Sequence, residues 1–176
     1  VSGDLLAYAL TGPPKRCRAL LRVTSSGGRA LLTRRGFNVS KLALDRRNLA
    51  VLSGEFSVRL RLINLVTGRG VLVAREDASA YGGAGTITDP GFVGGRLYFA
   101  MTSINASGTF GSTLGPFKVT PGRTPSCATS RRAFGDNVLL ESFAVDPPNA
   151  YYGDGEHLYQ TQLASLRFGR SKKGAC

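Results

Sequence analysis

The residues best suited to acid–base or metal chemistry stand together late in the chain, where residues 154–156 (Asp-Gly-Glu) precede the single histidine, His157. A histidine beside carboxylates could act as a general base or as one corner of a metal site. The segment lacks the D-x-[DN]-x-[DN]-G spacing and the distal glutamate of a calcium loop. Because residues 155–156 align with residues 54–55 in the internal repeat described below, we interpret the segment as a hairpin turn and expect no metal site.

Nucleophilic and cofactor chemistry have weak sequence support. The chain has no G-x-S-x-G elbow, and a Ser–His–Asp set would need His157 to meet a serine distant in sequence. The glycine-rich stretch 81–85 matches neither a P-loop nor G-x-G-x-x-G, and it precedes a predicted strand rather than a helix. We therefore expect a protein that is not an enzyme and that carries no cofactor.

The three cysteines, Cys17, Cys127 and Cys176, are far apart and form no C-x-x-C pair, which argues against a zinc knuckle or a redox dithiol. Three cysteines allow one disulfide and one free thiol, and an oxidising compartment favours the disulfide. A disulfide between Cys127 and Cys176 is the favoured pairing, since these residues lie on neighbouring repeat units. Free cysteines that pack as small hydrophobic residues explain the count equally well.

The charge of the chain is strongly positive, with 23 lysines and arginines against 11 acidic residues. The first 88 residues carry a net charge of +9 and the remainder +3. Such a balance favours an anionic partner. The arginines occur singly or in pairs rather than in a run, so a solvated basic surface is the alternative interpretation.

An internal repeat decides the fold class. Residues 48–55 align with residues 149–156, and the match continues without a gap at an offset of 101. The same pattern of an apolar strand, a turn and an alternating strand also starts at residues 5–10 and 96–101. The chain therefore contains four related units, whose boundaries we place at 1–38, 39–85, 86–135 and 136–176 within a single assembly over 1–176.

Each unit predicts a small antiparallel sheet. Apolar and polar residues alternate over Val58–Leu65 with the period of two that a half-buried strand requires. Each sheet should contain an innermost strand, a buried second strand, an alternating third strand and an edge strand. We expect these at about 39–44, 86–92 and 141–146 (innermost), 5–10, 49–53, 96–102 and 149–152 (second), 17–23, 58–65, 115–120 and 158–166 (third), and 31–32, 71–74 and 125–129 (edge).

Units of about 44 to 53 residues with four strands each are typical of β-propeller blades. The order of apolar strand, glycine turn, alternating strand and Gly-Arg turn, as in Leu49–Gly54 and Leu60–Arg69, resembles the blade repeat of TolB-type and WD-like bacterial β-propellers. The resemblance covers nearly the whole chain, although the G-H and W-D dipeptides of the strict WD type are absent. It implies an all-β binding scaffold that is secreted, periplasmic or on the bacterial cell surface.

Recognition by such a scaffold usually depends on its loops. The polar tract Thr102–Thr113 lengthens the hairpin of the third unit and predicts a contact loop for a protein or carbohydrate-like ligand. Its candidate ligand-binding residues are Asn105, Ser107, Thr109, Phe110 and Ser112. The alternatives are the propeller part of a larger extracytoplasmic hydrolase and a basic module that binds an anionic polymer.

Closure of the ring is the remaining question at this level. The first unit should lack its innermost strand and the fourth most of its edge strand. A four-bladed ring could close if the tails pair with each other. A six- or seven-bladed ring would instead be completed by further blades or by a second chain. The apolar runs are too short for a membrane span.

Overall fold

The structure is a computed structural model, and it describes residues 2–10, 20–36, 38–54, 57–77, 86–104, 110–121 and 140–166. These residues form β strands and one short 3-10 turn, with no α-helix among them. The all-β class predicted from the period-two pattern is thus confirmed. The described part also holds no helix long and apolar enough to cross a membrane.

The strands form four antiparallel sheets, which follow one another in chain order. The first sheet contains β1 (Leu5–Leu10), β2 (Leu20–Ser25) and β3 (Ala30–Arg35). The second contains β4 (Val39–Leu44), β5 (Asn48–Ser53), β6 (Ser57–Asn64) and β7 (Gly70–Asp77). The third contains β8 (Thr86–Ile87), β9 (Gly91–Val93), β10 (Arg96–Ile104) and β11 (Phe110–Val119). The fourth contains β12 (Ser142–Asp146), β13 (Asn149–Gly153) and β14 (Leu158–Gln162), and η2 (Leu163–Ser165) follows it.

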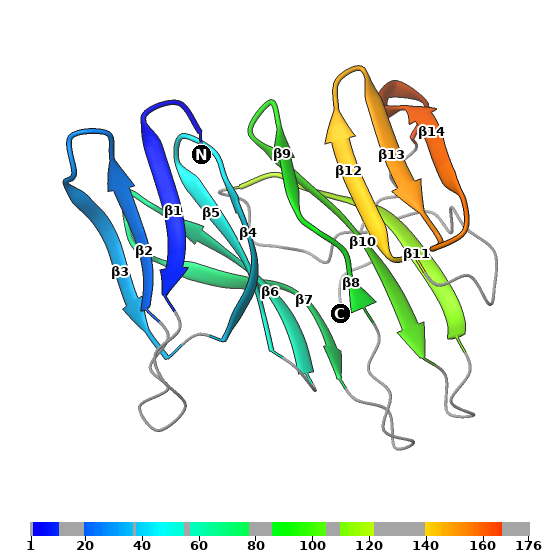
Figure 1. Cartoon of the computed structure of the whole chain (residues 1–176), viewed down its shortest axis with the longest axis horizontal. Helices are drawn as coiled ribbons and strands as arrows, with labels where there is room; N and C mark the ends of the chain where they lie inside the picture. The colour runs from blue at the N-terminus through cyan, green and yellow to red at the C-terminus, as the bar shows by residue number, and fades with distance from the viewer. Residues whose placement is uncertain are drawn as a thin grey trace.

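The sheets stand side by side, with the first and the fourth at opposite ends of the array (Figure 1). One strand of each sheet contacts a strand of the next sheet: β1 contacts β4, β4 contacts β9, and β9 contacts β12. Three hydrophobic clusters fill the spaces between consecutive sheets. The first contains Leu21, Val23, Leu32, Leu49, Val51 and Ile63. The second contains Ala50, Leu52, Leu60, Leu62, Val73, Ile87, Leu97, Phe99 and Val119. The third contains Tyr98, Ala100, Leu140, Phe143 and Ala150.

The strands β5 and β10 are buried from both sides. Alternate residues of a strand point to opposite faces, so Leu49 packs toward the first sheet and Ala50 toward the third. In β10, Phe99 packs toward the second sheet and Tyr98 toward the fourth. Of the second-strand residues expected in the core, Leu49, Val51, Leu97, Phe99 and Ala150 are fully buried and Tyr152 is half-buried.

The innermost strand expected at 86–92 is divided. Pro90 has no backbone N–H and cannot donate to the β ladder, so pairing stops after β8 and resumes at β9. Thr88 bridges the gap: its hydroxyl accepts the N–H of Ala100 at 2.8 Å, and its own N–H donates to the Ala100 carbonyl at 2.9 Å. The break therefore leaves no unsatisfied buried group at Thr88.

The third strand expected at 158–166 is shorter than predicted. It ends at Gln162, and residues 163–165 form η2. Leu163 and Leu166 pack against the cluster between the third and fourth sheets, and the Ser165 hydroxyl donates to the Gln162 carbonyl at 2.7 Å. Tertiary packing of these two leucines thus overrides the strand pattern at this end.

A candidate anion-binding site between the first two sheets

The histidine segment is a turn in the structure. The Asp154 carboxylate accepts the backbone N–H groups of Glu156 at 3.1 Å and His157 at 2.7 Å, and it accepts the Tyr159 hydroxyl at 3.2 Å. These hydrogen bonds, that of the His157 N–H above all, lower the pKa of Asp154. Burial and the neighbouring Asp154 raise the pKa of Tyr159. Asp154 therefore organises the β13–β14 hairpin, as the repeat predicted.

Metal chemistry has no support in the described ranges, where no group of three His, Cys, Asp or Glu residues could hold an ion. The predicted disulfide between Cys127 and Cys176 involves two residues outside the described part of the chain, as does Cys17. That pairing stays a prediction.

The predicted contact loop is placed only in part. Asn105, Ser107 and Thr109 lie outside the described residues. Phe110 and Ser112 belong to β11, where their backbones pair with Ile104 and Ser103 of β10. The β10–β11 hairpin therefore extends into the polar tract, and the ligand-binding role of the five residues stays a prediction.

A polar cleft opens elsewhere, beside β6 of the second sheet. Its volume is about 410 Å³, and it is lined by Gly36, Asn38, Ser53, Gly54, Ser57, Arg59 and Arg61. Every lining residue is either a glycine or a residue with a hydrogen-bonding side chain. A second cleft of about 420 Å³ between the third and fourth sheets includes Arg96 and Lys118, but apolar side chains such as Leu163 and Leu166 form much of its wall.

The register of β5 and β6 places both arginines of the polar cleft. Arg59 pairs with Ser53 and Arg61 with Val51, so the two arginines share the face of the sheet that packs toward the first sheet. Ile63, two residues further along, fills the hydrophobic cluster on that face. Val51, which pairs with Arg61, also belongs to this cluster, so the two arginines lie on the same face beside the hydrophobic contact between the two sheets.

Gly54 shapes the rim of the cleft. Its backbone has a φ of 107°, and a Cβ at this position would collide with the Ser57 carbonyl oxygen. Its N–H donates to the Asn38 carbonyl at 3.1 Å. Only glycine allows this close approach, which brings Asn38, Ser53 and Ser57 around one opening.

The charges of the site are unevenly matched. Arg59 stands directly opposite Arg75 in the β6–β7 ladder, and its Nε is buried without a hydrogen-bond partner. The nearby Asp77 carboxylate accepts the Ser57 hydroxyl at 2.5 Å and the Arg75 Nε at 2.7 Å. The Ser57 hydrogen bond, then that of Arg75, lowers the pKa of Asp77, and the charge of Arg59 adds to the effect. The Asp77 carboxylate thus lies near two positive charges, those of Arg75 and Arg59.

No family model and no curated protein matches this chain. The chemistry of the cleft must therefore be derived from its own residues. Two guanidinium groups and an amide can hold an oxyanion, because guanidinium groups stay protonated and donate in a planar fork. The hydroxyl of one lining serine, Ser57, is bound to the Asp77 carboxylate.

Sequence reasoning did not single out Arg59 and Arg61. Their alternation with Leu60 and Leu62 predicts a half-buried strand, in which polar residues would face water. The structure shows that both strand faces are partly covered, which turns the arginines toward a cleft. The sequence feature that could have indicated a basic site in this region is the excess of positive charge in the first half of the chain.

Proposed function

We propose that this protein is a non-enzymatic binding scaffold whose four sheets are blades of a β-propeller. Its ligand is a larger molecule with a phosphate, sulfate or carboxylate group, which the cleft beside β6 holds. The buried Nε of Arg59, which has no hydrogen-bond partner in a polar cleft, carries this proposal. An unpaired buried donor is costly, and a bound oxyanion would remove that cost.

The blade interpretation rests on the arrangement of the sheets. They pack face to face in chain order, and β1, β4, β9 and β12 contact each other in succession as strands near a ring axis would. The resemblance of the repeat to TolB-type and WD-like blades supports the same interpretation. It also supports a location outside the bacterial cytoplasm, where a glycan or a protein surface could supply the anionic group.

The test is a calorimetric titration with inorganic phosphate, sulfate and glucuronate at low salt. Replacing one charged donor should weaken binding about tenfold, so we compare the wild type with Arg59→Gln and Arg61→Gln. The matched control is Arg46→Gln, which removes the same charge from an exposed turn outside the cleft. If Arg59→Gln and Arg46→Gln bind the anions equally well, the loss of affinity comes from the lower net charge alone, and the proposed site would be wrong.

A second arm of the titration changes the carboxylate. Asp77→Asn should tighten binding a few-fold, because the negative charge near Arg59 is removed while the residue keeps its size. Asp89→Asn is the control, since Asp89 pairs with Lys41 at 3.1 Å and lines no part of the cleft. Weaker binding by Asp77→Asn would show that Asp77 positions the site rather than competing with the ligand.

A further inference from the structure

The cleft between the third and fourth sheets has two unlike walls. Its volume is about 420 Å³, within the range of about 300–1,000 Å³ that is typical of sites for small molecules. The third sheet contributes two basic side chains and a tyrosine, and the fourth contributes a proline, an alanine and two leucines. None of the residues that line the cleft, all of which lie in the described ranges, is acidic. A ligand that fits both walls must therefore combine a negative charge with an apolar body.

The strand register brings the basic groups of the first wall together. Arg96 and Tyr98 are two residues apart on β10, so they share a face of the sheet, and Lys118 of β11 stands directly opposite Tyr98. Tyr98 is only 5% exposed and belongs to the hydrophobic cluster between the third and fourth sheets, so this face meets the fourth sheet. Arg96 is exposed, and its guanidinium has no ion pair or hydrogen bond among the described residues.

The apolar wall is formed by η2, where the fourth sheet departs from the internal repeat. Leu163 aligns with Leu62 at the offset of 101, but Leu62 lies within β6 whereas Leu163 begins η2. The Leu163 N–H donates to the Pro148 carbonyl at 2.8 Å, which holds η2 against the β12–β13 turn. Leu163 and Leu166 are half-buried against the cluster between the sheets, and both line the cleft together with Ala164. The departure from the strand pattern thus creates this wall.

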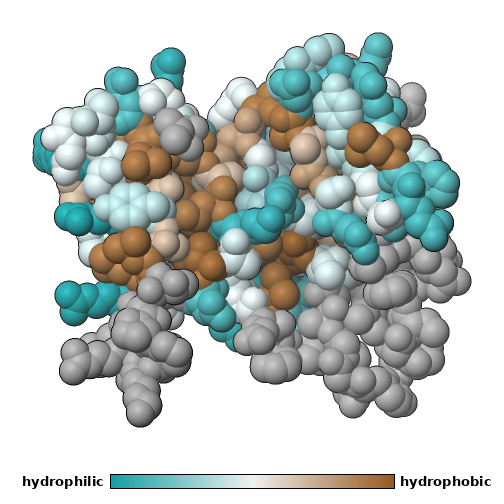
Figure 2. All heavy atoms as spheres, in the orientation of Figure 1, coloured by the Kyte–Doolittle hydropathy of each residue, from teal (hydrophilic) through white to brown (hydrophobic). Residues whose placement is uncertain are grey.

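Both walls lie at the same edge of the array. The β9–β10 turn, which precedes Arg96, and the β12–β13 turn, which contains Pro148, lie at the upper edge in Figure 1. Hydrophobic atoms reach the surface between β9 and β12, on the side of this interface that Figure 2 shows. The apolar contact between the third and fourth sheets therefore extends to the surface rather than ending beneath a polar layer.

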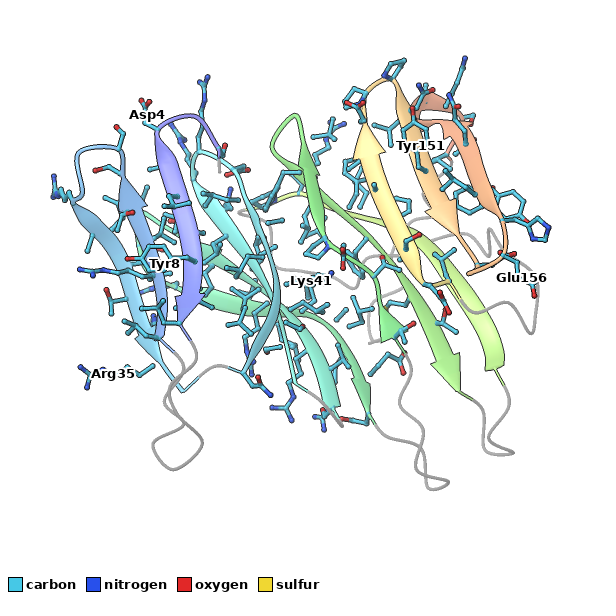
Figure 3. All side chains as sticks on the ribbon, viewed as in Figure 1. Asp4, Tyr8, Arg35, Lys41, Tyr151 and Glu156 are labelled. Atoms are coloured by element: carbon cyan, nitrogen blue, oxygen red, sulfur yellow. The ribbon has the colours of Figure 1, made fainter. Side chains whose placement is uncertain are left out.

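The carboxylates of the fourth sheet lie away from the cleft. Glu141, Asp154 and Glu156 lie at the β13–β14 turn, at the opposite end of the sheet from the β12–β13 turn (Figure 3). Asp146 lies on the face of β12 that is turned away from the third sheet, since its neighbour Val145 packs against the cluster between the sheets. The charge of the cleft therefore favours a negatively charged ligand.

We propose that this cleft binds a small organic anion with an apolar tail, namely an aliphatic carboxylate. Arg96 holds the carboxylate, with Lys118 beside it, because a guanidinium group donates two parallel hydrogen bonds to a carboxylate. The alkyl chain lies along Leu163 and Leu166, where it leaves water. The site is separate from the cleft beside β6, so this proposal goes beyond the function proposed for that cleft.

The first measurement tests the chemistry of the ligand on the wild-type protein. Calorimetric titrations compare octanoate with acetate and 1-octanol. We expect octanoate to bind at least tenfold more tightly than either, because acetate lacks the apolar chain and octanol lacks the charge. If octanoate binds no more tightly than acetate, the apolar wall contributes nothing, and if it binds no more tightly than octanol, the cations contribute nothing. Either result would overturn the proposal.

The second measurement locates the site. Arg96→Gln should weaken octanoate binding about tenfold, and Ala164→Glu should abolish it, because it places a negative charge in the cleft. The matched controls are Arg46→Gln and Gln162→Glu, which make the same charge changes at exposed residues that do not line the cleft. Both controls should bind octanoate like the wild type. Equal affinities of Arg96→Gln and Arg46→Gln would show that the anion binds elsewhere, and the proposal would be wrong.

Arg59→Gln separates the two clefts. It should leave octanoate binding unchanged, and Arg96→Gln should leave phosphate binding unchanged, because each arginine lines only its own cleft. If Arg59→Gln weakens octanoate binding instead, the carboxylate binds beside β6, and the present proposal fails while the proposed function stands. Circular dichroism must show the same β spectrum for every variant, and Lys118→Gln replaces Arg96→Gln if the latter does not fold.

Discussion

Two arginines, Arg59 and Arg75, lie near the Asp77 carboxylate beside the cleft. Arg59 and Arg75 stand opposite each other, an arrangement that like charges make unfavourable. Asp77 relieves part of that repulsion, but its carboxylate already accepts hydrogen bonds from Ser57 and Arg75. The buried Nε of Arg59 has no hydrogen-bond partner, which is why we propose that a ligand binds there, and the Ser57 hydroxyl connects the carboxylate to the cleft.

The first prediction concerns this coupling. Ser57→Ala should raise the pKa of Asp77 toward its ordinary value of 3.8, because the Ser57 hydrogen bond is the largest cause of the lowered pKa. A carboxylate whose folded pKa is lowered stabilises the fold above its unfolded pKa, and this contribution is lost as pH falls through the folded pKa. The stability advantage of the wild type should thus be present near neutral pH and disappear in acid. Carboxyl NMR titration measures the pKa directly.

The control for this titration is Ser53→Ala. The Ser53 hydroxyl donates to the Arg59 carbonyl at 3.5 Å and makes no contact with Asp77, so the pKa of Asp77 should stay lowered. If Ser57→Ala also leaves that pKa unchanged, the ion pair with Arg75 alone accounts for the shift.

At the scale of elements, the β5–β6 hairpin holds the cleft open, and Gly54 is its most constrained residue. Gly54→Ala should destabilise the protein by on the order of 1–3 kcal/mol, since alanine must adopt a positive φ and its Cβ meets the Ser57 carbonyl. Gly28→Ala is the matched control, because Gly28 also has a positive φ, of 76°, but a Cβ there meets no atom within 4 Å. Urea unfolding compares the two, and an equal cost would show that backbone strain, without the collision, explains both.

Much of the sheet structure follows from the sequence alone. The strands expected at 5–10 and 39–44 have those bounds in the structure, and the second of them ends at the turn residue Asp45. Asp45 forms such a turn by accepting the N–H groups of Arg47 and Asn48, both at 2.7 Å. The alignment at an offset of 101 pairs Gly54 with Gly155, and both residues have a positive φ, 107° and 91°. The turn residues and the internal repeat were sufficient to predict these features.

The remaining features depend on contacts between sheets. The packing of Leu163 on the third sheet ends β14 early, and no local signal at residues 158–166 predicts it. The position of Arg59 in a cleft likewise appears only when the face of β6 meets the first sheet. The pattern of a strand predicts which residues share a face, but it does not predict how far the neighbouring sheet extends over that face.

At the scale of the whole molecule, the sheets form a series in which each packs only on its neighbours within the described residues. Stability in such an array is the sum of contributions from each sheet and each interface. The second and third sheets have two interfaces each, while the first and fourth have one. The described array should therefore be most stable in its middle sheets and least stable in its first and fourth sheets.

Hydrogen exchange measures this gradient, and it is the last prediction. In a dilute sample, amides of β5 and β10 should exchange slowest, because both strands are covered on two sides. Amides of β3 and β14 should exchange fastest, since most of their side chains are exposed. Equal protection of all four sheets in the dilute sample would contradict the serial arrangement of stability.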